Sequence, residues 1–352
     1  MEFETIWEEY GYGQLQEEMD RLFPAYHLSF PDLMRRLFQG DVIGVLSDFL
    51  QWSIQDLAGD LTELKNIFAW LLVLGVVAAL MGHFMEVFDR HQVADLSFYF
   101  IYLLMSTVLL KCFSQTAQMT EAVLGDIVLF NRLLVPAYLM AVGVAAGAVT
   151  AGAYYQLMLI LLCIVQEILT AVLIPLVYSY CLLAVLNGIW IEEKLTMLME
   201  LVEKLIGWIL KAALWIVTGL GVFQSVLTPV LESFQNSIMQ KAVGAVPGIG
   251  DAAEGVMKLT VGSAVVVKNS MGLGLLILLV FLCAAPLLRI FFTGFMLKTA
   301  AAFMGIVSHK RITACADKVG NGAFFLLRIA GTTMLLFLIA LAVIAVATNK
   351  GY

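Results

Sequence analysis

Apolar runs separated by short polar stretches dominate the chain from residue 66 onward. The first run extends from Ile67 to Phe84, and the polar residues from Glu86 to Asp95 end it. Two further runs cover residues 96–110 and 133–150. A helix crosses a bilayer core of about 30 Å with around 20 apolar residues. These three runs are therefore predicted to be transmembrane helices.

Two stretches between the apolar runs have a mixed polar and apolar character. Residues 114–132 contain Gln115, Gln118, Glu121, Asp126 and Arg132. Residues 187–204 are polar too, with leucines that recur on one helical face. We expect an interfacial helix at 114–132 and an amphipathic surface helix at 187–204.

The run from residue 157 to residue 186 is too long for one simple crossing. As a helix it would extend about 45 Å, and Pro175 inside it should kink or break that helix. Glu167 lies near its middle, next to Gln166. An ionisable group at the bilayer centre costs roughly 2.5 kcal/mol or more. Glu167 therefore either lines an aqueous path, or marks a helix end or pairs with a basic residue on a neighbouring helix.

Three later runs, at residues 205–227, 272–288 and 324–346, are also predicted to span the membrane. A basic stretch from Arg289 to Lys318 lies between the last two. Because positive charge beside a span favours the cytoplasmic side, we expect this stretch inside and both ends of the chain outside. The pattern predicts an all-α polytopic membrane protein with about six to eight transmembrane helices.

Residues 228–270 carry an amphipathic pattern instead. Apolar residues recur every three or four positions, and Val-Pro-Gly-Ile-Gly-Asp, ending at Asp251, is a strong turn signal. Asp251 can cap the following helix, with Glu254 three positions on. We expect a hairpin of two amphipathic helices. Its polar face must meet protein or water, so the hairpin is either re-entrant and pore-lining, which we favour, or lies flat at the interface.

Residues 1–65 form a short acidic region with thirteen acidic and four basic residues. Helical spacing of its apolar residues predicts helices that pack on neighbours or on the membrane surface, or that bind a partner. The first ten residues do not resemble a signal peptide, so the chain enters the membrane through its first internal span, or a leader precedes this sequence. The predicted regions are an extracytoplasmic 1–65, transmembrane and interfacial helices at 66–227, the hairpin at 228–270, and C-terminal transmembrane helices at 271–352.

The composition supports a membrane location. Hydrophobic residues make up 61% of the chain and charged residues 13%, with a mean hydropathy of +0.93; soluble domains have about 45–50% and about 25%. No clustered basic face suggests nucleic-acid binding. The five cysteines and four histidines are dispersed, so we expect no metal site and no cofactor. Phosphate-loop, nucleophile-elbow and HExxH motifs are absent from the sequence, and we expect no enzyme.

One segment resembles a known family. Gly244 to Gly272 reads GAVPGIGDAAEGVMKLTVGSAVVVKNSMG. It is similar to the most characteristic stretch of the stage III sporulation protein AE family, in which a Val-Pro-x-x-Gly turn precedes an amphipathic helix, a small-residue stretch, and Val-Lys-Asn followed by Gly. Ala285 to Arg289 also resembles the apolar-Pro-x-x-basic pattern of that family.

The resemblance implies a subunit of the transport apparatus between mother cell and forespore in endospore-forming bacteria. Such a subunit is a multi-pass protein of the mother-cell membrane around the forespore, and it resembles a permease or export gate. The implied partners are a secretion-type ATPase, small membrane proteins and ring-forming proteins, and the subunit itself lies in the lipid bilayer. Association of the chain with further copies of itself, as a homo-oligomer, is left open. The apparatus supports late forespore development.

The candidate site residues come from the hairpin and from the long apolar run. They are Pro247, Gly248, Gly250, Asp251, Lys268, Asn269 and the intramembrane carboxylate Glu167. The proline and glycines could serve the turn alone, and Lys268 and Asn269 an interfacial helix end. Three hypotheses follow: a channel or export-gate subunit, a non-conducting scaffold of the same apparatus, and a stand-alone secondary transporter. The third predicts inverted repeats with paired broken helices.

Overall fold

The computed structural model describes most of the chain. The described residues are 39–87, 91–146, 160–190, 194–243, 250–307 and 310–347, together with Asp20, Ser29, Asp32, Leu33, Arg35, Arg36 and Met158. The regular structure in these ranges is helical, and no strand occurs in them. The all-α prediction is therefore confirmed for this part of the chain.

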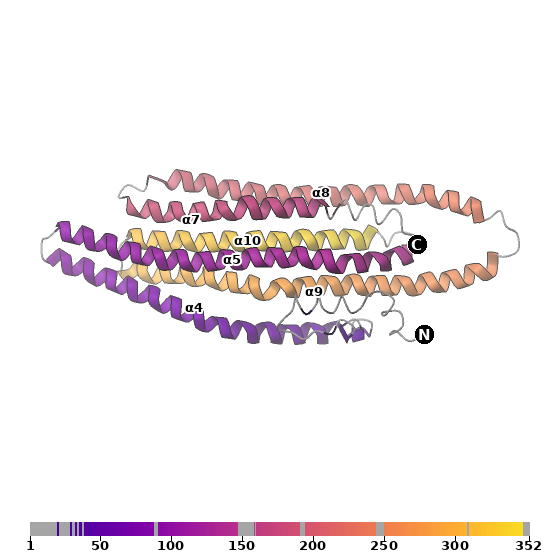
Figure 1. Ribbon diagram of the computed structural model, residues 1–352, viewed down its shortest axis with the longest axis horizontal. Coiled ribbons are helices and arrows are strands. Elements are labelled where there is room, and N and C mark those ends of the chain that lie inside the picture. The colour runs from indigo at the N-terminus through magenta and orange to yellow at the C-terminus, as the bar shows by residue number, and fades with distance from the viewer. Residues whose placement is uncertain are drawn as a thin grey trace.

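Long helices lie side by side in an elongated bundle (Figure 1). They are α4 (Val42–Val87), α5 (His91–Ala146), α7 (Ile174–Ile189), α8 (Thr196–Val243), α9 (Gly250–Val307) and α10 (Lys310–Ala347), with a π-helical turn, η1 (Leu169–Leu173), before α7. The 58 residues of α9 extend about 87 Å. A bilayer core of about 30 Å therefore covers only part of this helix.

The helices are longer than the sequence pattern predicted. Residues 96–110, 114–132 and 133–146 all belong to α5, so the separate interfacial helix at 114–132 is wrong. In the same way, α4 joins the last part of the acidic region 1–65 to the first predicted span. Polar residues do not by themselves end a helix, because the backbone hydrogen bonds continue while the polar side chains occupy one face.

The separate surface helix that was predicted at 187–204 is wrong. α7 ends at Ile189 and α8 begins at Thr196, so a connection interrupts this stretch and residues 196–204 are the start of the long helix α8. Asn187 stabilises the connection: its side-chain oxygen accepts the N–H of Leu195 at 2.8 Å, and its Nδ2 donates to Oγ1 of Thr196 at 3.4 Å. This side chain provides hydrogen-bond partners where the backbone leaves the helix.

Pro175 was predicted to kink or break its helix, and the break is not formed. Residues 160–189 are one helix, with the π-turn η1 directly before the first turn of α7, which contains Pro175. A proline lacks an N–H and crowds the carbonyl four residues earlier, and a local π-turn is a known way for a helix to continue through such a site.

α10 is the central helix of the bundle and packs on α5, α7, α8 and α9. Its closest approach is at Gly322, where a Cβ atom would overlap the sulfur of Cys181 on α7 and lie 3.2 Å from the ring of Phe113 on α5. On the other side of α9, the ring of Phe49 on α4 stacks on Phe281 at 3.7 Å. The start of α4 is thereby packed on the bundle, as its helical spacing of apolar residues predicted.

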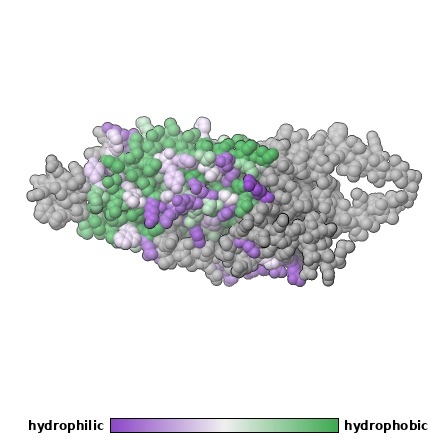
Figure 2. Space-filling model, in the orientation of Figure 1, coloured by the Kyte–Doolittle hydropathy of each residue, from purple (hydrophilic) through white to green (hydrophobic). Residues whose placement is uncertain are grey.

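Four helices in the described part of the chain are long and apolar enough to cross a membrane. They are Phe98–Arg132, Ile160–Ile189, Gly272–Ile306 and Lys310–Val343, and a shorter apolar helix covers Lys65–Leu80. Large apolar side chains such as Trp70, Phe100 and Trp215 are exposed on the outside of the bundle, which is largely hydrophobic where it is coloured in Figure 2. A membrane protein is supported, while the count of six to eight spans is not confirmed.

Candidate functional site

The predicted hairpin lies where α8 and α9 extend beyond the ends of α5 and α10 (Figure 1). Gly250 and Asp251 are in the first turn of α9, and Lys268 and Asn269 follow along the same helix. Pro247 and Gly248, at the turn, lie outside the described residues, as do the side chains from 250 to 269.

The two helices that contain the arms of this hairpin have different neighbours over their full lengths. α8 packs on α7 and α10, whereas α9 packs on α10, α5 and α4. A hairpin of two mutually packed amphipathic helices is therefore not confirmed within the described residues. The role of the six hairpin residues stays a prediction.

Glu167 lies on the outward side of the helix that it shares with α7. Its side chain is exposed, whereas the neighbouring Gln166 is buried and donates from Nε2 to the carbonyl oxygen of Leu124 on α5 at 2.9 Å. Glu167 therefore does not line a path inside the described bundle. Gln166 is one of the polar groups that join this helix to α5, along with the bond from the hydroxyl of Tyr102 to the carbonyl oxygen of Val185.

Exposed polar residues follow one side of α5 within the candidate span Phe98–Arg132. They are Thr107, Lys111, Gln115, Gln118, Glu121 and Asp126, and we call them the α5 polar face. They recur at intervals of three to five positions, so they share one side of the helix. The opposite side is apolar and buried, with Leu109, Phe113, Ala117 and Leu124. Sequence reasoning noticed Gln115, Gln118, Glu121 and Asp126 but assigned them to an interfacial helix.

The α5 polar face is unfavourable against lipid. Within the described residues, no ion pair or hydrogen bond is formed by the charged groups of Lys111, Glu121 and Asp126. A charge on a helix at the bilayer centre costs roughly 2.5–3.5 kcal/mol. Figure 2 shows hydrophilic residues along the middle of the apolar surface, where Figure 1 places α5. This face therefore requires water or another protein opposite it.

A second set of polar residues lies on α10. Asp317 and Asn321 are partly buried and Arg328 is exposed, and we call these three residues the α10 polar face. Asp317 accepts a hydrogen bond from Nζ of Lys298 on α9 at 2.7 Å. Arg328 is near the middle of the candidate span Lys310–Val343, and its guanidinium lies 5.7 Å from the ring of Phe325 on the same helix.

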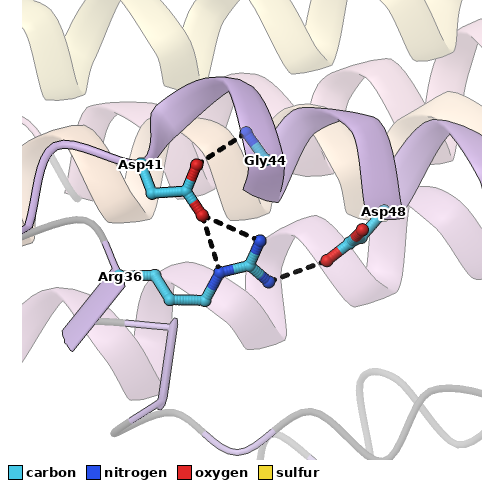
Figure 3. A network of polar contacts seen from close by, with 4 residues as sticks. All are labelled: Arg36, Asp41, Gly44 and Asp48. Carbon is cyan, nitrogen blue, oxygen red and sulfur yellow. Dashed lines mark hydrogen bonds and ion pairs between the residues drawn. The ribbon is translucent and has the colours of Figure 1, made fainter.

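A polar network fixes the start of α4 (Figure 3). The carboxylate of Asp41 caps the helix by accepting the N–H of Gly44 at 3.0 Å. Arg36 donates to Asp48 at 2.7 Å and to Asp41 at 3.0 and 3.1 Å. These bonds, to Asp48 first and then to Asp41, raise the pKa of Arg36 above its ordinary value. The arginine stays charged at any physiological pH and joins the preceding segment to the helix.

These features define a class of protein: an all-helical membrane protein whose candidate spans carry outward-facing charged surfaces. The chain belongs to the stage III sporulation protein AE family, since the family model described as "Stage III sporulation protein AE" matches residues 28–348. It is 19% identical over 280 residues to "Stage III sporulation protein AE" of Bacillus subtilis (strain 168), which covers 79% of this chain and 70% of that protein. No solved structure matches the chain. The predicted membership of this family is confirmed.

Proposed function

We propose that this chain is a channel or export-gate subunit of the sporulation transport apparatus linking mother cell and forespore. It acts in the mother-cell membrane around the forespore and is needed for late forespore development. Family membership supports a role in sporulation. The structural observation that carries the proposal is the α5 polar face, because charged residues on a lipid-embedded helix need water or protein opposite them.

A non-conducting scaffold of the same apparatus is the second candidate. Glu167 favours it, because this carboxylate faces outward instead of lining a path inside the bundle. In both cases we propose a secretion-type ATPase, small membrane proteins and ring-forming proteins as partners, and no catalytic activity for the chain itself.

Deletion of the gene in the source organism tests the role in sporulation. Sporulating cells would be scored for a late-forespore reporter and for forespore size, with complementation by the full chain as the control. We expect the reporter to stay off and the forespores to shrink after engulfment. Normal sporulation in the deletion strain would overturn the proposal and leave a stand-alone transporter as the better hypothesis.

Cysteine substitutions along residues 251–269 separate a conduit from a scaffold. Each would be introduced into a cysteine-free background and treated with a water-soluble thiol reagent, with Ala117→Cys, at a buried position of α5, as the protected control. Labelling with helical periodicity supports a water-lined face. Uniform protection favours the scaffold.

A further inference from the structure

The α5 and α10 polar faces point away from each other within one subunit. The buried side of α5 places Phe113 against Gly322 of α10. Lys111 and Gln118 are on the opposite side of α5 from Phe113, two and five residues away along a helix of 3.6 residues per turn. By the same geometry Asp317 and Arg328 are on the side of α10 away from Gly322. The subunit therefore carries a polar face on each of two opposite sides.

The charges on the two faces occur in complementary order. On α5 the base Lys111 precedes the acid Glu121 by ten residues, and on α10 the acid Asp317 precedes the base Arg328 by eleven residues. At 1.5 Å per residue these spacings are about 15 Å and about 16.5 Å. One face therefore presents base then acid, and the other presents acid then base, at nearly equal separations.

The two helices also have matching directions and depths. α5 and α10 run parallel, because Phe98 lies under the guanidinium of Arg311 at 4.2 Å and Phe113, further along α5, meets Gly322, further along α10. This alignment gives the depth of each charged residue along the bundle axis. Lys111 lies within about two helical turns of the depth of Asp317, and Glu121 lies within about two turns of the depth of Arg328. Both residues of α5 are displaced in the same direction from their counterparts on α10. Long side chains and a small tilt of one helix against the other bridge this difference in depth.

We propose that the α5 polar face of one copy docks on the α10 polar face of a second copy. Lys111 then meets Asp317, and Glu121 meets Arg328. Asp317 can accept Lys111 as well as Lys298, because a carboxylate has sites for several donors. Rotation about the membrane normal preserves both depth and helix direction. Repeating this contact between two different faces gives a ring when the rotation closes. In this arrangement the α5 polar face is covered by protein, so any conduit of the ring lies along another surface.

Charge reversal at the Glu121–Arg328 pair is the first test. The full chain would be purified in detergent and its oligomer size measured by native mass spectrometry over a range of concentrations. We expect Glu121→Arg and Arg328→Glu each to weaken association at least about tenfold, and the double variant to restore it. Lys65→Glu, an exposed charge on α4, is the matched control and should have no effect. A monomeric wild-type chain, or a double variant that stays dissociated, overturns the proposal.

Disulfide cross-linking in membranes is the second test. Glu121→Cys and Arg328→Cys would be combined in a Cys163→Ser background, since Cys163 is exposed and the other four cysteines are buried. The double variant should give a ladder of cross-linked species, and neither single variant should cross-link. A cross-link in a single variant would show a two-fold interface instead. Labelling of residue 121 by a water-soluble reagent without any ladder would show that this face lines water. Either result rejects the docking.

Discussion

A single glycine decides how closely α10 approaches α5 and α7. We expect Gly322→Ala to destabilise the bundle by about 1–3 kcal/mol, because the added methyl group overlaps Cys181 and crowds Phe113. Gly331→Ala on the same helix is the matched control, since a Cβ there meets nothing within 4 Å. It should be neutral or slightly stabilising, because alanine is the better helix former. Thermal unfolding of both variants in one detergent measures the difference, and equal melting temperatures would contradict the close approach.

The cap of α4 is a second test at single-residue resolution. We expect Asp41→Ala to lose about 0.5–2 kcal/mol of local helix stability, because the N–H of Gly44 loses its acceptor. Asp41→Asn keeps a capping oxygen and should lose less, although its ion pair with Arg36 is gone. Hydrogen exchange of the amides at 43–45 reports the change. Equal exchange in both variants and the wild type would show that the carboxylate does not cap the helix.

Single residues were predictable where periodicity determines burial. Val45 and Phe49 were expected on one helical face, and both are buried. The capping role of Asn187 was not found in advance, although Asn187-Gly188 is a turn signal directly before the end of α7. The outward position of Glu167 was also unpredictable, since which side of an almost wholly apolar helix faces the core depends on its neighbours.

At the scale of the helix, the π-turn η1 connects residues 160–168 to α7. Because a π-turn holds one extra residue while the helix on either side keeps its register, deletion of Ala171 should leave a regular α-helix in which residues 160–168 keep their rotational position. Gln166 would then keep its bond to the carbonyl of Leu124, and we expect a folded yield close to that of the wild type. Deletion of Leu182, an exposed residue in the regular part of α7, is the contrast. It should rotate the preceding residues by about 100° relative to the rest of α7 and cause a large loss of folded protein. Size-exclusion chromatography of both variants compares the folded yields.

The lengths of the helices were underestimated from the sequence for one physical reason. A hydropathy reading treats a polar stretch as an exit from the membrane, although a helix continues wherever its backbone bonds are intact. Residues 114–132 show this: their polar side chains occupy only the outer side of α5, while Phe113, Ala117 and Leu124 continue the buried side. A helical-period analysis across 98–132 would have connected the two predicted elements.

At the scale of the whole molecule, the class of protein was predictable and the arrangement of its helices was not. Composition and apolar runs are sufficient to predict a helical membrane protein, because each span is recognised from the apolar residues of its own segment. The central position of α10 and the opposite polar faces depend on contacts between distant segments, such as Tyr180 with Phe325. Whether the two helices of the predicted hairpin pack on each other depends on the neighbours of α8 and α9. Sequence periodicity does not identify those neighbours.

A group of basic residues at one end of the bundle predicts its orientation. The connection between α7 and α8 and the connection between α9 and α10 lie at one end, and α4 begins toward the other (Figure 1). The first end carries Lys194, Lys298, Lys310, Arg311 and Lys318. Because positive charge beside spans favours the cytoplasm, we expect this end to be cytoplasmic.

Single cysteines at exposed positions test both this orientation and the number of crossings. In intact non-sporulating cells that express the chain, Lys194→Cys and Lys310→Cys should be protected from an impermeant thiol reagent until the cells are permeabilised, whereas Gln39→Cys should be labelled directly. If α8 and α9 both cross the membrane, the first two positions lie on the same side. If α4, α5 and the helix at 160–189 each cross, Gln39 lies opposite to Lys194. Labelling of Lys194→Cys and Lys310→Cys from different sides would show that α8 or α9 does not cross.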